Sequence, residues 1–282
     1  MEEVRGLEIY SNDVVAARRF ANSADLEVAM LKFAASFFSV CVAVCVVCAD
    51  AQAAKPKNAF PKLRVLVITG GHDFERESFF TLFQGYDDIE YKEAVHPEAN
   101  NMFAPDAIKN FDVIVLYDMN QQITEEQKRN FVSALRAGKG LVVIHHAIAN
   151  YQDWPEYEKI IGGRYYLEPK VVNGVPKARS AYEHDVRFTV HIADPKHPIV
   201  QGLKDFEIED EVYSLFDVSP SAKPLLTTDH PKSNKVIAWT HKYGKARVVY
   251  IQLGHGPSAY NNPNYRRLVA NAVRWVANRP PK

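Results

Sequence analysis

The sequence is poor in cysteine. Its three cysteines, Cys41, Cys45 and Cys48, all lie in one apolar segment near the N-terminus, and none follows between Ala54 and residue 282. Because we expect that segment to be removed as part of a signal peptide, the mature chain contains no cysteine. Disulfide bonds, a cysteine nucleophile and a thiolate metal site are therefore excluded from the mature protein.

Other missing features each remove a class of function. The 34 basic and 34 acidic side chains leave no net charge, so no nucleic acid is expected as a partner. The first apolar run is followed by G-G-H-D-F-E rather than G-x-G-x-x-G, which disfavours dinucleotide binding. No H-E-x-x-H or other compact metal-ligand spacing occurs. With 47% hydrophobic residues, the chain is expected to form a globular enzyme or binding protein.

A hydrophobic run long enough for a transmembrane helix is also missing. The apolar run at 33–49 is shorter than the roughly 20 residues that span a bilayer, and Ala51-Gln52-Ala53 fits a cleavage site. We interpret residues 30–53 as a signal peptide cleaved near Ala53 and expect a periplasmic or extracellular protein without stable membrane anchoring. An uncleaved signal anchor is the alternative. Residues 1–29 are interpreted as a mis-assigned start before Met30 or a disordered extension.

Residues 54–282 suit a single α/β domain. Continuous apolar runs at 63–70, 111–118 and 140–146 are typical of strands buried on both faces of a parallel sheet. Helices are expected at 75–84 and 124–138, the second with Thr124 as its N-cap and Gly138 as its end. The order β-α-β-α-β predicts a doubly wound sheet with right-handed crossovers.

The second half of this region has a different pattern. Strand-like segments predominate, and we expect them to extend the same sheet as mixed strands closed by a C-terminal helix. Gly244 lies between the last two strands and predicts a hairpin. Residues 163–185 are expected to form a long surface loop near the site. The strand-like segments are 186–194, 205–215, 223–230, 235–244 and 246–254, and the helix is 264–279.

Polar residues follow the predicted strands at the edge where ligands bind in open α/β sheets. Three strand ends deliver histidine to this edge, although each histidine alone could be a turn, capping or packed residue. The residues at these strand ends are Gly71, His72, Asp73, Asp118, Asn120, His145, His146 and His255.

The adjacent histidines at 145 and 146 are not expected to share one role. Successive side chains on a strand point to opposite faces, so one should be buried and the other should face the pocket. We predict that His146 faces the pocket, because it lies one step further into the turn. In the acidic segment at 205–215, Glu211 and Tyr213 share one face of a strand, where solvated carboxylates on an edge strand are the alternative.

Motifs in a fixed order carry a resemblance to a known family. "VLVITGGHDF", "GKGLVVIHHAI", "IIGGRYY", "HPIVQGLKDFEIEDEVY" and "AWTHKYGKARVVYIQLGHG" resemble the ThuA-like family, named for trehalose utilisation. The resemblance implies a flavodoxin-like fold of the class I glutamine amidotransferase-like superfamily, with helices on both faces of a mostly parallel sheet. In that superfamily a cysteine nucleophile lies on the turn after the central strand, and here that place is "IHHA".

The resemblance also implies a set of site residues. The catalytic residues would be His72, His146, Glu211 and His255, with His145 as the alternative to His146. A histidine that many members carry after the "GGRYY" motif is missing, and whether His184 replaces it stays open. From their places in the sequence rather than from the resemblance, we expect Gly71, Asp73, Asp118, Asn120, His145, Trp154 and Tyr213 to bind substrate.

We expect an exported enzyme of carbohydrate metabolism, a hydrolase, lyase or isomerase acting on a glycoside or 3-keto-sugar. His146 or His255 would move a proton and Glu211 would orient it. A divalent metal ion such as zinc, held by His72, Glu211 and His255, is the second mechanism. A non-catalytic sugar-binding module is the alternative function, and a homo-oligomer stays open.

Overall fold

The structure is a computed structural model that describes residues 60–282, so the predicted signal peptide and the segment before it lie outside the described residues. Its centre is a nine-stranded sheet. The strands that pair in parallel are β2 (Ile89–Val95), β1 (Leu63–Gly70), β3 (Val113–Asp118), β4 (Gly140–Ile144) and β13 (Ala246–Ile251). The strands that continue the sheet antiparallel are β12 (Val236–Tyr243), β11 (Lys223–Thr227), β8 (Ala181–Ile192) and β9 (Phe206–Ser214).

The strand order is β2, β1, β3, β4, β13, β12, β11, β8, β9. The predicted α/β class is confirmed, and so is the extension of the same sheet by strands from the second half of the chain. The hairpin predicted at Gly244 joins β12 and β13, with Tyr243 paired to Ala246. The carboxyl ends of the parallel strands therefore meet at one edge, as the sequence analysis assumes.

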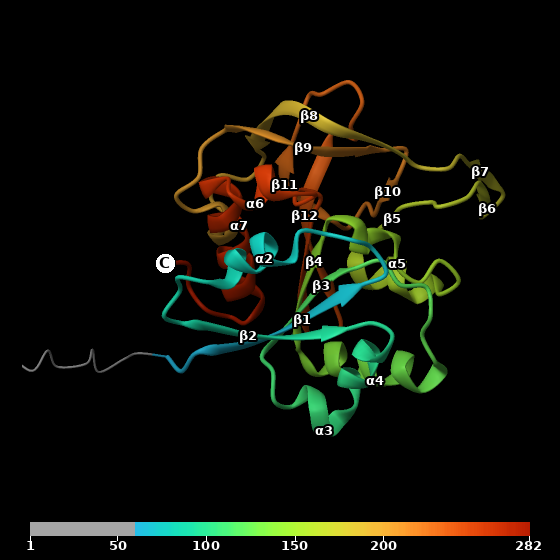
Figure 1. Ribbon diagram of the computed structural model, residues 1–282. Helices are drawn as coiled ribbons and strands as arrows, with labels where there is room; N and C mark the ends of the chain where they lie inside the picture. Colours follow the sequence, from blue (N-terminus) through green and yellow to red (C-terminus); the bar gives the residue numbers. More distant parts are fainter. Residues whose placement is uncertain (1–59) are drawn as a thin grey trace, which may run out of the picture. The chain divides into compact units, whose positions relative to one another are not determined.

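Helices pack on both sides of the central strands (Figure 1). The helices are α2 (Arg76–Phe80), α6 (Pro257–Tyr260) and α7 (Pro263–Val276) on one side, and α3 (Pro105–Ile108), α4 (Glu125–Ala137) and α5 (Pro155–Ile161) on the other. Successive β1 residues point to opposite sides, so Val65 packs in the cluster that contains Leu268 and Leu66 in the cluster that contains Phe131. Each such buried side chain contributes about 1.5–3 kcal/mol.

Helix α4 begins and ends where the sequence predicts. The Thr124 side chain accepts a hydrogen bond from the Gln127 backbone N–H, and the Gln127 side chain accepts one from the Thr124 backbone N–H, which completes a capping box. Gly138 ends the helix with a φ of 109°, in the left-handed region that favours glycine. None of the helices within residues 60–282 has the length and apolar character needed to cross a bilayer.

Three details differ from the sequence analysis. Strand β2 was not predicted, because it lies at the sheet edge and its mostly exposed residues form no apolar run. Residues 163–185 are not one loop, because Asn173 and Gly174 turn a hairpin there, and the Asn-Gly pair was an overlooked signal. The last apolar run ends at Ile144, so the two adjacent histidines begin a short 3₁₀ helix.

The remaining short elements complete the chain. They are the strands β5 (Gly163–Arg164), β6 (Lys170–Val172), β7 (Val175–Lys177) and β10 (Asp217–Val218), and the 3₁₀ helices η1 (Thr81–Phe83), η2 (Glu98–Phe103), η3 (His145–Ala149) and η4 (Pro198–Val200). In the sheet's extension, the pairing of β8 with β9 shifts between Glu183 and Val186, where Asp185 has a φ of 56°. This bulge redirects the residues of β8 that precede it.

A bidentate ion pair ties the C-terminal helix to the start of β2. The Nε and Nη2 atoms of Arg274 each donate a hydrogen bond of 2.9 Å to the carboxylate of Asp88. The hydrogen bond from Arg274 lowers the pKa of Asp88 below its usual value. Because Arg274 is almost fully buried, its charge depends on this carboxylate.

We predict that Asp88→Asn lowers the free energy of unfolding at pH 7 by about 1–3 kcal/mol, because it removes a charge-assisted pair from a buried guanidinium. A lowered folded-state pKa stabilises the fold above the unfolded pKa, and this contribution is lost as the pH falls through the folded pKa. The difference from wild type in urea denaturation should therefore shrink below about pH 4. The control is Asp87→Asn, whose exposed side chain pairs with Lys282, and an equal loss there would contradict the prediction.

Candidate functional site

The site begins where β4 ends. His145 follows Ile144 and has a φ of 56°, in the left-handed region that costs a non-glycine residue roughly 1–2 kcal/mol. Histidine is among the residues that enter this region more often than most. The sharp change of direction places the His145 ring, which is fully buried, beside the ends of β9 and β13.

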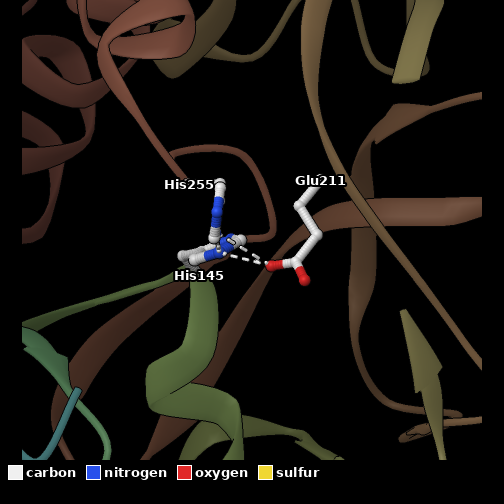
Figure 2. Close-up of side chains that lie close together, drawn as sticks. All are labelled: His145, Glu211 and His255. Atoms are coloured by element: carbon white, nitrogen blue, oxygen red, sulfur yellow. Dashed lines mark hydrogen bonds and ion pairs between the residues drawn. The ribbon is translucent and has the colours of Figure 1, made fainter. Parts of the chain in front are cut away.

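The hydrogen bonds of His145 fix its ring. Its Nδ1 lies 2.6 Å from the backbone oxygen of Gln252, which can only accept, so Nδ1 carries a proton and donates. Its Nε2 lies 2.9 Å from Oε2 of Glu211 and 3.2 Å from Nδ1 of His255 (Figure 2). The hydroxyl of Tyr213 is also 2.9 Å from Nε2. His145 thus presents Nε2, and not Nδ1, to the other site residues.

Glu211 lies on β9 and points toward both histidines (Figure 2). Its Oε2 is 3.2 Å from Nδ1 of His255, and its Oε1 is 3.5 Å from Nδ1 of His184. Burial alone would raise the pKa of the Glu211 carboxyl, but the hydrogen bonds from His145 and His255 outweigh it and hold the pKa well below its usual value. The carboxylate is therefore ionised, and its hydrogen bond raises the pKa of His255.

His255 is held by its backbone. Asp210, buried on β9, accepts hydrogen bonds from the backbone N–H groups of Gly254 at 2.7 Å, His255 at 2.9 Å and Glu211 at 2.9 Å. The hydroxyl of Tyr260 donates to the His255 carbonyl at 3.0 Å. One carboxylate thus fixes both the His255 loop and the strand that carries Glu211.

His146 points away from this trio. Its ring stacks on His72, with ring centroids 4.5 Å apart, and neither of its ring nitrogens has a hydrogen-bond partner among the described residues. Burial, with smaller contributions from His145 and His72, lowers the pKa of His146 well below its usual value. His145, and not His146, therefore contacts Glu211 and His255, whereas His146 faces the cavity described next, as the sequence predicts.

A cavity of about 240 Å³ lies beside Glu211, whereas His145 and His255 lie behind its lining. Both members of the stacked pair, His72 and His146, line it, as does Glu211. The other lining residues are Met119, Ile148, Ala149, Tyr165, Leu167, Arg179, Tyr182, His184 and Tyr213. A groove of about 540 Å³ lies at the opposite ends of the parallel strands, around Leu63 and Asp112, far from the histidine cluster. Glu211 belongs both to the histidine cluster and to the lining of the smaller cavity. We therefore take that cavity as the candidate site.

Comparison with known proteins identifies the family. The profile of the ThuA family, described as trehalose utilisation, matches residues 64–276. The chain belongs to the ThuA family. No curated protein sequence gave a significant match.

Solved structures have the same fold as this ThuA-family chain. A ThuA-like protein from Parabacteroides merdae is 19% identical, with a TM-score of 0.67 over 78% of this chain and 92% of that one. A ThuA-like protein from Bacteroides uniformis is 20% identical, with a TM-score of 0.61 over 81% of this chain and 99% of that one. A β-galactosidase from Bacillus circulans sp. alkalophilus is 9% identical, with a TM-score of 0.51 over 80% of this chain but 32% of that one, and shows the fold alone.

Several residues expected to bind substrate in this ThuA-family chain lie outside the cavity lining. Gly71 instead lets its backbone pass close to the backbone of Met119, since a Cβ at position 71 would lie 2.2 Å from the Met119 carbonyl oxygen. Asp118 is buried and bonded to His96 and Asn150. The other four are His145, which is fully buried, Asp73, which is exposed, Asn120, which bonds to the Gln122 backbone, and Trp154, which packs against Phe131 and Tyr151.

Other site residues were missed or left open by sequence reasoning. Arg179, Tyr182 and His184 line the cavity from the start of β8 and the residue pair before it, which the sequence analysis assigned to a loop. The bulge after His184 could not be read from the residue pattern. The sequence did contain a signal for Asp210. Alternation along the strand places it on the same face as Ile208 and Val212, and an acidic residue between two apolar ones on a buried face needs hydrogen-bond partners.

We predict that Asp210→Asn lowers the free energy of unfolding by about 1–3 kcal/mol, because the amide nitrogen cannot accept and leaves a buried N–H unpaired. Urea denaturation measures the loss. The matched control is Glu209→Gln on the same strand. Its exposed carboxylate pairs with Arg187, and the substitution should change the free energy of unfolding by no more than about 0.5 kcal/mol. Equal effects of the two substitutions would contradict the role given to Asp210.

Proposed function

We propose that this ThuA-family chain is an enzyme of carbohydrate metabolism that acts on a glycoside or a 3-keto-sugar. The observation that carries the proposal is the meeting of His145, Glu211 and His255, of which Glu211 also lines a cavity of about 240 Å³. The family description, trehalose utilisation, supports the substrate class.

The arrangement suits acid–base chemistry. Glu211 is ionised and bonded to Nδ1 of His255, so it orients the ring and leaves the other ring nitrogen of His255 for a ligand. The His255 side chain is 31% exposed, so it can exchange a proton with a bound molecule. Such a group can remove a proton next to a keto group or protonate a leaving glycosidic oxygen, which are steps of a lyase, an isomerase or a hydrolase.

The cavity supports recognition of one sugar ring. Its volume is below the roughly 300–1,000 Å³ of pockets for drug-sized ligands, so a second ring would lie at the rim. Tyr165 and Tyr182 line it and offer aromatic surface to the apolar face of a sugar. The unpaired ring nitrogens of His146 are buried beside the cavity and can hydrogen-bond a hydroxyl or carbonyl oxygen of the ligand.

A non-catalytic sugar-binding module is the second candidate. The observation that favours it is the complete burial of His145, whose ring is fixed by Gln252 and surrounded by polar partners. The corner residue therefore cannot attack a substrate as a nucleophile there. On this alternative, the same cavity binds a sugar without turning it over.

We predict that Glu211→Gln and His255→Ala each reduce turnover of 3-keto-disaccharides by about 10²-fold or more, because each removes one member of the acid–base pair. Product formation and calorimetric binding are measured on the same samples. His191→Asn is the control, since His191 lies on β8 outside the cavity lining and bonds to Asp205. Tight sugar binding with no product from the wild type would establish the binding module, and unchanged turnover in both variants would refute the assigned residues.

We also propose that the protein is exported after cleavage near Ala53, supported by the apolar segment and the small residues after it. Expression of the full chain should give a mature product that begins near Ala54, which N-terminal sequencing of the exported fraction detects. Retention of the uncleaved chain would support a signal anchor instead.

A further inference from the structure

We propose that Nε2 of His145, Oε2 of Glu211 and Nδ1 of His255 bind one divalent transition-metal ion of the zinc class. The inference deepens the proposed function and rests on the same site, but metal binding can be measured without turnover. It replaces the ligand set expected from the sequence, in which His72 held the place that the structure gives to His145.

The first argument is the shape of the cluster. The three atoms form a nearly regular triangle, with separations of 2.9 Å between His145 and Glu211, 3.2 Å between His145 and His255, and 3.2 Å between His255 and Glu211. Ligand atoms about 2.0–2.1 Å from a tetrahedral zinc ion lie roughly 3.3 Å apart. The side chains therefore need to move only a few tenths of an ångström to share an ion.

The second argument is the orientation of the three atoms. Nδ1 of His145 is committed to the Gln252 carbonyl, so Nε2 is the ring nitrogen that faces the other two groups. Oε2 of Glu211 and Nδ1 of His255 both face this nitrogen. A single metal ion can bind all three atoms at once.

The third argument is the support around the ligands. Histidines that bind metal commonly donate their second N–H to a backbone carbonyl or carboxylate, as His145 does to Gln252. Asp210 fixes the backbone of both Glu211 and His255 and so holds two of the three ligands in place. Such support is what a rigid metal site requires.

The donor set indicates the class of ion. Two imidazoles and one carboxylate favour zinc, iron or cobalt over magnesium or calcium, and they leave coordination positions open, as catalytic sites do. Glu211 also lines the cavity, which puts the open side within reach of a bound ligand. His72 is not a ligand, because its ring centroid lies 6.5 Å from that of His255 and its Nδ1 bonds to the Asp73 carbonyl.

The test uses the purified protein, stripped with a chelator and titrated with ZnCl₂ in a calorimeter. We expect one equivalent of zinc per chain, and we expect cobalt(II) to give the visible absorption of a four- or five-coordinate site. Glu211→Gln and His145→Gln should each weaken zinc binding by more than the 10–100-fold typical of outer-sphere changes. His72→Ala and His191→Asn are the controls and should leave stoichiometry and affinity unchanged.

The outcomes separate the metal site from the function. No stoichiometric zinc binding by the wild type, or binding that Glu211→Gln leaves intact, would overturn the metal site. Stoichiometric zinc without turnover of any keto-sugar would support the metal site while the proposed enzyme fails. Full turnover by chelator-treated, metal-free protein would support the acid–base enzyme and overturn a catalytic metal.

Discussion

Backbone N–H groups from two separate segments meet at the buried carboxylate of Asp210. One segment is β9, through Glu211, and the other is the loop after β13, through Gly254 and His255. Burial raises the pKa of Asp210 despite these bonds, so the site keeps a costly group in its interior. The three hydrogen bonds offset part of this cost. The same side chain also fixes the position of Glu211 relative to His255.

The second constraint is the backbone at His145. Two neighbouring histidines would point to opposite faces of a strand, but the strand ends before them and the left-handed residue begins a 3₁₀ helix. His145 therefore turns toward Glu211, while His146 stacks on His72 at the cavity. The corner after β4 thus carries a buried imidazole whose ring is fixed by the Gln252 carbonyl.

Much of the fold could be predicted from local pattern. The apolar runs of β1, β3 and β4 and the caps of α4 at Thr124 and Gly138 are short-range signals, and they were read correctly. Residues that follow parallel strands were expected to meet at one edge of the sheet, and this correctly placed His72, His145, His146 and His255 in one region. The exposed strand β2 gave no such signal.

The pairings within the site could not be predicted in the same way. Which histidine meets Glu211 depends on one φ angle at residue 145, and a sequence does not state dihedral angles. The position of His184 depends on a bulge between β8 and β9, which alternation cannot foresee. Trp154 and Asp118 were expected near the substrate because of their place in the sequence, but aromatic packing holds Trp154 elsewhere and hydrogen bonds to His96 and Asn150 hold Asp118 elsewhere.

The order of strands has a consequence for how the site comes into being. Glu211 lies on the edge strand β9, whereas His145 follows β4, and β13, β12, β11 and β8 stand between them in the sheet. The contact between Glu211 and His145 joins strands that are not neighbours in the sheet, so it requires the antiparallel extension from β12 to β9 to be in place. A chain that has folded only its parallel strands would already hold His145, His146 and His255 and still have no site, because Glu211 lies on β9.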